Sequence, residues 1–356
     1  MIKKLSRVIA RACGKPIDQK KLMANGIVLC PKEEVSCPKA IYIDSHLLRV
    51  KGASIYSSME VENINLHNTL AVHEPTVLYS IGSTNLFSGG LWTDKREYSI
   101  RLLSQEDQRF KVDLDQAVLV DSDLSNHFFG HWLHDVVPST LIGTVEMPSL
   151  AFKKPKYPHA DDYQSILNLD IIYGNKGRVK NLFFLNDFSQ NSHKAKRYMQ
   201  VRSLIKEKLN PQDSPYSGVY IARGSAGAKR MLTNESALIE HLARRGFDIV
   251  CPEKITAETL IRQLWNAPII VSVEGSALAH PIYSIAQNGA YLVLQPPFRV
   301  SHTHKGMCDA MNRPYGFYVC QPSDDEGSFY VDSMMEIDRL IDQLENEKIK
   351  RKFINN

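Results

Sequence analysis

Pro268-Ile-Ile-Val-Ser-Val273, which runs into Glu274-Gly275-Ser276, is the stretch that decides the fold of this chain. A nearly continuous apolar run of this length is typical of a strand that is buried on both faces of a sheet. Strand-like segments also occur at 218–223, 247–251 and 290–294, and helix-like segments alternate with them at 234–245, 257–265 and 276–286. This alternation predicts an α/β domain built on a parallel, doubly wound sheet.

The first half of the chain reads differently. Short strand-like runs separated by polar turns lie at 26–30, 39–44, 74–79, 117–121 and 181–185. A segment rich in His and Trp at 125–141 and a polar segment at 189–208 have helical periodicity. Two prolines and a glycine in 210–218 mark a boundary. We therefore expect an N-terminal domain over 1–209, a C-terminal domain over 210–330, and a charged amphipathic helix over 331–356.

Composition sets the broad class of protein. The chain has 356 residues with a formal net charge of +4; 43% of residues are hydrophobic and 23% are charged. This length predicts about two domains, and this composition excludes disorder for most of the chain. No apolar run is long enough to span a membrane, and the charge is too small to indicate nucleic acid binding. Six cysteines without a Cys-x-x-Cys pair predict free thiols rather than a zinc site.

The first twelve residues form a distinct pattern. Apolar residues recur at near-helical spacing, and four Lys and Arg residues occupy the other positions. Such a basic amphipathic helix can lie on an anionic membrane surface, although a solvated or core-docked terminal helix fits the pattern as well. This segment lacks the apolar core of a signal peptide. The expected location is therefore the cytoplasm, and contact with a membrane surface stays one of the two interpretations of residues 1–12.

Basic residues follow the first strand of the C-terminal domain. Arg223 leaves that strand into a loop of small residues, and Lys229 and Arg230 follow within the same loop. Backbone N–H groups and guanidinium forks of this kind can bind a phosphate, and the carboxyl ends of parallel strands are where ligands bind. A solvated basic turn is the competing interpretation.

The loop after 268–273 is a second candidate. Gly275 permits a positive φ or a close approach of the backbone, and the N–H groups near Ser276 can bind an anion. The Glu274 carboxylate either accepts a hydrogen bond from a ribose or sugar hydroxyl, acts as a base, or serves as a cap. The next segment, 295–304, has prolines that stop its strand, and we expect it to close the sheet. Its His302 and His304 either contact substrate or are exposed loop histidines.

The densest cluster of chemistry lies in 126–138. His131 and Asp135 are four residues apart and share a helical face, so the pair can deprotonate a hydroxyl. Alternatively, His127, His131, His134 and Asp135 can bind zinc or iron. Trp132 can stack on a sugar ring or belong to the core. For Asp121-Ser-Asp123 just upstream, we favour a turn or helix cap over a divalent cation site.

Three motifs together resemble those of a known family. His131-Trp-Leu-His-Asp135-Val-Val-Pro138 resembles the first signature of the family 61 glycosyltransferases. Tyr220-Ile-Ala-Arg223, followed by Arg230, Asn234 and Gly246-Phe247, resembles the second. Val273-Glu-Gly-Ser-Ala-Leu278 resembles the third, except that Glu274 stands where many members have His. The order and spacing agree over residues 126–294.

The resemblance implies a GT-B-like fold, in which two Rossmann-like domains face each other across a cleft. It implies inverting sugar transfer from a nucleotide-sugar to a glycan or glycolipid hydroxyl, without a metal or other cofactor. Together with the pattern of residues 1–12, the resemblance implies a bacterial-type enzyme of capsule or lipopolysaccharide synthesis that works in the cytoplasm, peripherally on the inner face of the cell membrane. The residues that it assigns are Asp135, His131 and Glu274 as catalytic candidates, with Arg223, Lys229, Arg230, Asn234, Gly275, Ser276 and His280 at the donor and Trp132 and His134 at the acceptor. A metal-dependent hydrolase using the histidine cluster, or a non-catalytic nucleotide-binding module, are the alternatives.

Overall fold

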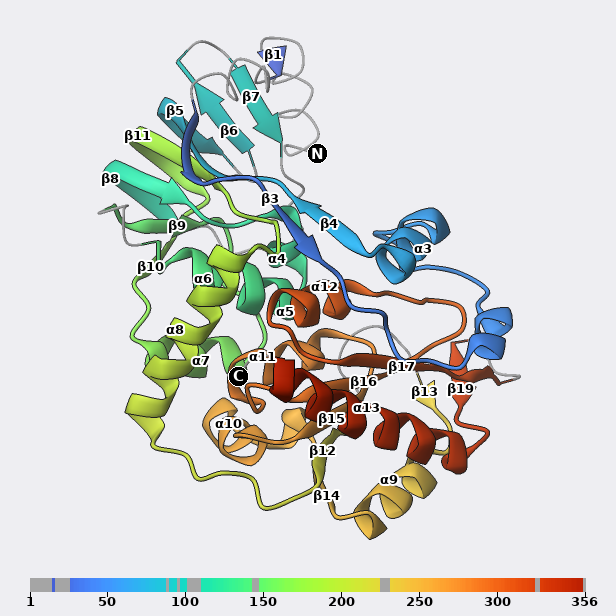
Figure 1. The fold of residues 1–356 in the computed structure, drawn as a ribbon. Helices are drawn as coiled ribbons and strands as arrows, with labels where there is room; N and C mark the ends of the chain where they lie inside the picture. Colours follow the sequence, from blue (N-terminus) through green and yellow to red (C-terminus); the bar gives the residue numbers. More distant parts are fainter. Residues whose placement is uncertain are drawn as a thin grey trace. The chain divides into compact units, whose positions relative to one another are not determined.

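The computed structural model describes residues 15–16, 26–87, 90–94, 97–100, 110–142, 147–224, 231–323 and 327–354. The protein is a mixed α/β structure with several sheets, and it divides into two compact units (Figure 1). Unit 1 comprises Met1–Glu33 and Glu74–Ser189, and unit 2 comprises Glu34–His73 and Gln190–Asn356. The sequence assigns 34–73 and 190–209 to the first domain, whereas contacts place them in unit 2.

These contacts explain the different division. Ile41 forms a β-bridge with Gly316, and Ala53 forms one with Val300, so an early segment is attached to the late strands. Helix α8 (Ser192–Leu209) packs against α11 (Pro281–Ser284) and α12 (Thr303–Ala310). The predicted strand at 39–44 is represented only by the bridge at Ile41.

Unit 2 is built on a five-stranded sheet in which every neighbouring pair is parallel. Its spatial order is β14-β12-β15-β16-β17. The bounds are β12 Gly218–Ile221, β14 Phe247–Val250, β15 Ile269–Val273, β16 Ala290–Gln295 and β17 Tyr315–Val319. The four predicted strands are confirmed. The expectation that 295–304 closes the sheet is wrong, because α12 follows that segment and returns the chain to a fifth strand, β17.

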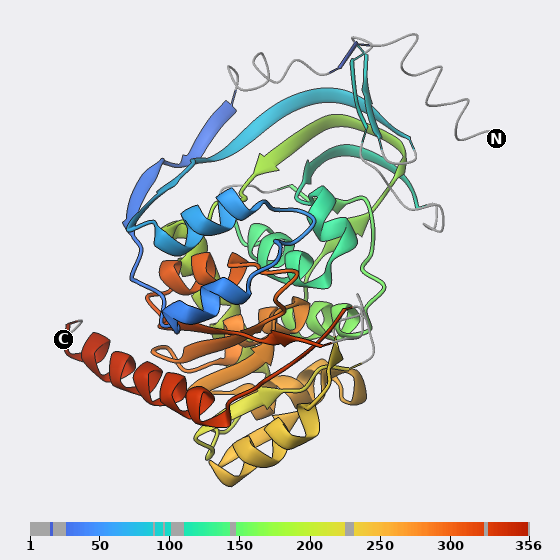
Figure 2. The same cartoon turned by 90° about the vertical axis from the view of Figure 1, so that its right-hand side faces the viewer.

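Helices cover both faces of this sheet because strand side chains alternate in direction. Tyr220, Val271 and Leu292 pack on one face with α9 (Glu235–Arg244) and α13 (Met334–Ile354). Val219 and Val293 pack on the other face with α10 (Ala257–Leu264) and α12. Figure 2 shows α13 in red running past the strands with α9 in yellow beside them. The doubly wound arrangement predicted for this half is thus confirmed.

Local sequence signals set the ends of these helices. The Thr256 hydroxyl accepts a hydrogen bond from the backbone N–H of Thr259 at 3.2 Å, which caps α10. Gly246 follows α9 with a φ of 80°, a conformation that favours glycine. The predicted helix at 276–286 is instead divided into a 3₁₀ turn, Ser276–Ala279, and the short α11. Pro281 lacks the N–H that a continuous helix would need there.

The order of the strands reverses between β12 and β15. The chain passes from β12 outward to β14 and then returns to the other side of β12 to form β15, β16 and β17. In open parallel sheets, ligands bind outside the carboxyl ends of the strands at such a switch point. The loops after β12 and β15, which contain Arg223 and Glu274, both begin at this place.

Unit 1 contains a mixed nine-stranded sheet in the order β1-β7-β6-β5-β11-β8-β9-β10, with β2 paired to β5. The strands β11, β8, β9 and β10 are mutually parallel, whereas β2, β5, β6 and β7 pair antiparallel. Only the parallel part therefore matches a Rossmann-like sheet. The bounds are β1 Lys15–Pro16, β2 Gly26–Cys30, β5 Thr76–Phe87, β6 Gly90–Thr93, β7 Glu97–Ile100, β8 Lys111–Leu119, β9 Ser149–Ala151, β10 Ile171–Tyr173 and β11 Lys176–Asn186.

The remaining elements are short. Outside the segment 121–139 they are β3 Glu33–Ser36, α3 Met59–His67, β4 Leu70–His73, α7 His159–Leu167, β13 Met231–Leu232, β18 Gln321–Pro322, β19 Ser328–Tyr330 and the 3₁₀ helices Asp44–Arg49 and Pro252–Lys254. Within the described part of the chain, Cys30, Cys37, Cys251, Cys308 and Cys320 are free thiols, as predicted. No helix in that part has both the length and the apolar character needed to cross a membrane. The amphipathic segment 1–12 lies outside the described residues.

Candidate functional site

The His-rich segment lies directly after the carboxyl end of β8. It forms α4 (Asp123–His127), α5 (Phe129–His131), a π-helical turn (Trp132–Val136) and α6 (Val137–Ser139). Ser122 caps α4 through a capping box with Ser125. The Asp121 carboxylate accepts the backbone N–H of Phe152 at 2.8 Å. Ser122 therefore has the capping role that the sequence predicts for 121–123, whereas Asp121 holds the backbone just after β9 (Ser149–Ala151).

The π-helical turn determines which side chains of this segment meet. The backbone N–H of Val137 bonds to the carbonyl of Trp132, five residues earlier. Pro138 has no N–H to offer the carbonyl four residues before it, and its ring would crowd that carbonyl in a regular helix. Single π-helical turns inside helices occur frequently at functional sites. Here the wider turn places His131, His134 and Asp135 next to one another.

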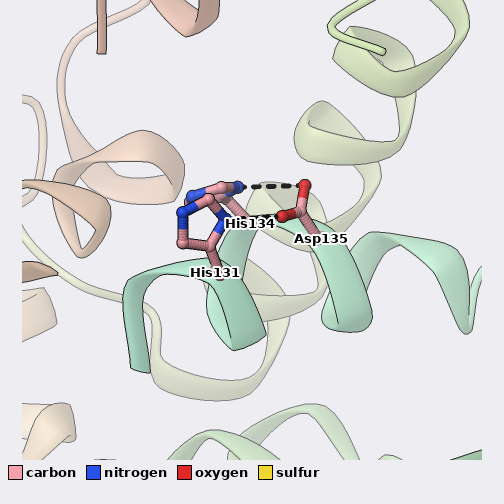
Figure 3. A group of neighbouring side chains, drawn as sticks. All are labelled: His131, His134 and Asp135. Carbon is pink, nitrogen blue, oxygen red and sulfur yellow. Dashed lines mark hydrogen bonds and ion pairs between the residues drawn. The ribbon is translucent and has the colours of Figure 1, made fainter. Parts of the chain in front are cut away.

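The Asp135 carboxylate lies between two imidazoles (Figure 3). Nδ1 of His131 is 3.0 Å from Oδ2 of Asp135 and forms a hydrogen bond with it. Nδ1 of His134 is 3.1 Å from Oδ1 of the same carboxylate. The side chain of His131 is 25% exposed, whereas that of Asp135 is 9% exposed. An ionised carboxylate only accepts hydrogen bonds, so it fixes the proton of His131 on Nδ1 and leaves Nε2 as a base.

The same three residues could also hold a metal ion. Their ligand atoms all lie within 4.8 Å of one another. His127, the fourth ligand of the metal-dependent alternative, is exposed at the end of α4 and does not belong to this group. Both carboxylate oxygens of Asp135 already face an imidazole nitrogen, and a metal would have to displace those contacts. The arrangement therefore fits an acid–base pair without further movement.

Trp132 and His134 occupy interior positions. Trp132 is 1% exposed, and its indole packs against the ring of Phe129 at a centroid distance of 5.9 Å. In this structure Trp132 is therefore a core residue that offers no face to a sugar ring. His134 is also buried, and its ring lies 4.7 Å from that of His131. His131 is the member of this group with the more accessible side chain.

A buried carboxylate that no sequence pattern marks as functional, Asp187, is connected to this segment through Ser139. Asp187 follows β11 and is 3% exposed. Its Oδ1 accepts the Thr76 hydroxyl at 2.7 Å, and its Oδ2 lies 3.1 Å from the Ser139 hydroxyl. The Ser139 hydroxyl also lies 2.7 Å from the backbone carbonyl oxygen of Asp135. The buried network thus connects the start of β5, at Thr76, and the end of β11, at Asp187, to the turn that carries Asp135.

In unit 2, charged residues converge on the carboxyl edge of the sheet. Arg223 follows β12, Glu253 follows β14, Glu274 follows β15, and Arg299 follows β16. Burial lowers the pKa of Arg223, the Glu274 and Glu253 carboxylates oppose that effect, and the Arg299 guanidinium reinforces it. Glu253, Glu274 and Arg299 are therefore each close enough to Arg223 to act on its charge. Arg299 is a further candidate in the segment 295–304, from which the sequence pattern predicts only His302 and His304 as possible substrate contacts.

Glu235 fixes the beginning of the Arg223 loop. Its Oε1 atom accepts the Tyr220 hydroxyl at 2.7 Å and the backbone N–H of Arg223 at 2.8 Å. Gly224 lets the Glu253 carboxyl group approach this loop, since a Cβ at this position would collide with that carboxyl group. The loop therefore starts from a defined backbone position. Lys229 and Arg230 lie outside the described residues.

The second loop is also tightly constrained. Gly275 has a φ of 152° and a ψ of −179°, a conformation that is almost restricted to glycine. Glu274 is buried, and its backbone N–H bonds to the carbonyl of Leu294 at 2.9 Å. Ser276 is exposed at the start of the 3₁₀ turn. His280 is fully enclosed, so it supports this loop from inside.

Asn234 and the two histidines of the segment 295–304 have protein neighbours that hold the fold together. The Asn234 amide donates to the carbonyl of Val331 at 2.7 Å and accepts its N–H at 3.1 Å, which ties the start of α9 to the end of β19. His302 and His304 are buried rather than exposed. Nδ1 of His302 lies 3.3 Å from the Tyr315 hydroxyl, and its backbone N–H donates to the Glu62 carboxylate. Neither histidine has the exposed position expected of a loop residue.

The motifs and the comparison with protein families agree. Residues 129–293 match the family model described as Glycosyltransferase 61. The resemblance to that family is confirmed. The matched segment contains His131, Asp135, Asp187, Arg223 and Glu274, and it supports a glycosyltransferase.

The comparisons with curated proteins and with solved structures do not identify a substrate. A search of curated proteins found no match. Among solved structures, the chain is similar to a dodecameric iron-containing heptosyltransferase, TibC, in complex with ADP-D-β-D-heptose. The identity is 12%, the match covers 78% of this chain and 94% of that chain, and the TM-score is 0.31. A TM-score this low does not establish a common fold.

Proposed function

We propose that this protein is an inverting, metal-independent glycosyltransferase of the GT-B type. It transfers a sugar from a nucleotide-sugar to a hydroxyl of a glycan or glycolipid acceptor, in the synthesis of a surface polysaccharide such as capsule or lipopolysaccharide. The observation that carries the proposal is the 3.0 Å pair between His131 and Asp135, which lies within the family match.

His131 is the proposed general base. Its Nε2 takes the proton of the acceptor hydroxyl while Asp135 holds Nδ1 and stabilises the imidazolium that forms. The acceptor oxygen forms a bond to C1 of the donor sugar as the bond from C1 to the diphosphate oxygen breaks. The electron pair leaves with the nucleoside diphosphate, and a single displacement inverts C1. Glu274 is the second candidate base, and its place on the carboxyl edge of unit 2 favours a role at the donor.

The carboxyl edge of unit 2 is the proposed donor site. Arg223 and Arg299 supply cations for the developing charge on the diphosphate, and planar guanidinium forks suit phosphate oxygens. Glu274 supplies an acceptor for a sugar or ribose hydroxyl. The exposed Ser276 and the glycine-specific backbone at Gly275 allow the loop to approach the donor closely. Lys229 and Arg230 are proposed to join this site from the same loop as Arg223.

The proposed acceptor lies at an anionic membrane surface on the cytoplasmic side. The basic amphipathic pattern of 1–12 supports this location from sequence alone. A protein that meets lipid-linked acceptors there needs no spanning helix of its own. Vesicle flotation of the full chain, compared with a variant in which the four basic residues of 1–12 are Gln, tests this part separately.

The decisive experiment is a thermal-shift screen against UDP-, GDP-, CMP- and dTDP-sugars, followed by a transfer assay with the sugar that binds. A donor that binds the folded state raises Tm. We expect one nucleotide class to raise Tm and to support transfer that persists in EDTA. A Tm unchanged by every nucleotide would favour the non-catalytic module. Tightly bound zinc or iron, with activity lost in EDTA, would favour the metal-dependent hydrolase built on His131, His134 and Asp135.

A further inference from the structure

The loop after β16 needs hydrogen-bond donors from elsewhere in the fold. It runs from Pro296 to Val300 and carries Arg299 at the carboxyl edge of the sheet. Pro296 and Pro297 have no N–H to offer. The N–H of Arg299 bonds back to the carbonyl of Pro296 at 3.1 Å. The carbonyls of Pro297 and Val300 take their donors from outside the loop.

Those donors belong to residues 49–62, a segment of unit 2 that we call the brace. Four backbone hydrogen bonds among the described residues join the brace to the loop: the N–H groups of Lys51 and Gly52 to the Pro297 carbonyl at 2.6 and 3.3 Å, that of Ser54 to the Val300 carbonyl at 3.1 Å, and that of Val300 to the Gly52 carbonyl at 2.9 Å. The brace therefore bonds to the loop on both sides of Arg299, two residues before it and one residue after it.

The brace is itself attached to unit 2 at both of its ends. The Arg49 guanidinium donates to both carboxylate oxygens of Asp332, at 2.9 and 3.1 Å, and to the carbonyl of Val319 at the end of β17. The buried Glu62 carboxylate, on α3, accepts the backbone N–H of His302 at 2.6 Å. The segment between these two anchors is therefore held against the loop that carries Arg299.

The Arg299 side chain depends on this support from the backbone. Its Nε is buried and has no hydrogen-bond acceptor among the described protein atoms. Burial lowers the pKa of Arg223, and the nearby Arg299 guanidinium adds to that effect. Two guanidinium groups this close repel each other, so the backbone has to hold Arg299 in place against that repulsion. An anion that contacts both groups would relieve it.

Gly52 is the point at which the brace comes close to the backbone of Arg299. A Cβ at Gly52 would lie 3.0 Å from the carbonyl oxygen of Phe298, and this oxygen would have to move to accommodate it. That carbonyl belongs to the peptide bond that joins Phe298 to Arg299. The φ of Gly52 is not positive, so alanine can adopt the same backbone conformation. A methyl group added at Gly52 therefore acts on the peptide bond of Arg299.

We propose that the brace is a positioning element of the donor site, and that its contact at Gly52 sets where the Arg299 guanidinium meets the diphosphate of the donor. This inference rests on the proposed function, because it takes the carboxyl edge of unit 2 as the donor site. A cation that is already in place binds an anion more tightly, since binding does not have to order it. The brace and Arg299 both lie outside residues 129–293, the segment that matches the family model.

The test is a double-mutant cycle in the full-length protein. Calorimetric titration with UDP, GDP, CDP and dTDP identifies the nucleotide that binds. We expect G52A to raise the Kd of that nucleotide by about fivefold, as part of the roughly tenfold loss expected for R299Q. Because Gly52 acts through Arg299, G52A should raise the Kd no further in the R299Q background. Losses that add in the double variant, or an unchanged Kd in G52A, overturn the proposal.

Two further variants make the cycle specific. G306A is the matched control, because a Cβ at Gly306 of α12 makes an ordinary contact with Cγ of Gln190 at 3.9 Å, and its Kd should not change. R49K keeps the charge but loses the two-point contact with Asp332, so it should raise the Kd only where Arg299 is present. R49K decides the matter if G52A does not fold. Binding of no nucleotide by the original protein contradicts the proposed function, and this inference falls with it. Binding that G52A and R49K leave unchanged contradicts this inference alone.

Discussion

The hydroxyl of Ser139 joins two acidic residues that are 52 positions apart in the sequence. It lies 2.7 Å from the backbone carbonyl oxygen of Asp135 and 3.1 Å from Oδ2 of Asp187. All three residues are buried. The turn that carries the proposed acid–base pair is therefore anchored to the end of β11, and not only to the strand β8 that precedes it. A rigid anchor of this kind keeps the Asp135 carboxylate within hydrogen-bond distance of His131.

Replacing Asp135 with Asn should lower kcat strongly. The amide cannot stabilise the imidazolium, and it no longer fixes the proton of His131 on Nδ1. We expect a loss of about 10²–10⁴-fold, the usual contribution of general acid–base catalysis, with little change in Tm or in the Kd of the donor. Steady-state transfer assays and donor titrations measure this. Asp161→Asn is the control, because Asp161 is an exposed residue of α7 that pairs with Lys154. Near-full transfer by a folded D135N would contradict the assignment.

Replacing Ser139 with Ala should lower both stability and kcat. The single hydrogen of the Ser139 hydroxyl serves the Asp135 carbonyl and the Asp187 carboxylate, so its loss removes a donor from two buried acceptors, which typically costs about 1–3 kcal/mol. The carbonyl of Asp135 loses its contact as well, so the pair with His131 should loosen. Urea unfolding and kcat report the two effects. Thr140→Ala is the neighbouring control, because that hydroxyl donates to the Val137 carbonyl and the residue is half-buried. Equal losses in S139A and T140A would show that the network has no special role.

The parallel sheet of unit 2 follows from the sequence because each of its first four strands is an apolar run with a helix between. Tyr315–Val319 was missed because the prolines at 296 and 297 looked like the end of the sheet. The sequence also paired His131 with Asp135 correctly, since four residues span one helical turn. It could not place Asp187, whose role depends on β11 lying beside β8, a contact between distant segments. The position of Arg299 beside Arg223 and the burial of Trp132 also depend on contacts between distant segments, so the sequence could not predict them.

Replacing Arg223 or Arg299 with Gln should weaken donor binding. Each guanidinium is proposed to contact the diphosphate, so we expect KM for the donor to rise by about tenfold or more for each, as for the loss of a charge-assisted hydrogen bond. The thermal shift produced by the nucleotide should shrink in parallel. Arg244→Gln, in the last turn of α9, is a control that should leave KM unchanged. An unchanged KM in both R223Q and R299Q would remove the carboxyl edge of unit 2 as the donor site.

Replacing Glu235 with Gln should separate positioning from binding. Glu235 has no proposed contact with substrate, but it accepts hydrogen bonds from Tyr220 and from the backbone of Arg223. Gln keeps one oxygen, so we expect a smaller rise in donor KM than in R223Q, with a kcat near that of the original protein. Glu235→Ala should lose both hydrogen bonds and raise KM further. A loss of kcat with unchanged KM would instead point to a direct part in the chemistry.

His302 should make the stability of unit 2 fall in mild acid. Burial, and then the charge of Lys305, lowers its pKa from 6.5 to about 4. Between these values the unfolded chain binds more protons than the folded protein, so the free energy of unfolding increases with pH. Above pH 6.5 His302 is neutral in both states and does not reduce the free energy of unfolding. As the pH falls from 6.5 toward 4, that free energy decreases by about 3 kcal/mol in all. Urea unfolding of the full chain across this range measures the slope.

His302→Gln should flatten that slope, because Gln does not titrate. Its stability at pH 7 should also be lower, since the contact between Nδ1 and the Tyr315 hydroxyl at 3.3 Å is altered. His127→Gln removes an exposed imidazole from α4 and should keep the original pH dependence. If the H302Q protein loses stability between pH 6.5 and 4 as steeply as the original, the acid sensitivity arises from other groups. The buried carboxylate Glu62, which accepts the backbone N–H of His302, would then be the next residue to replace.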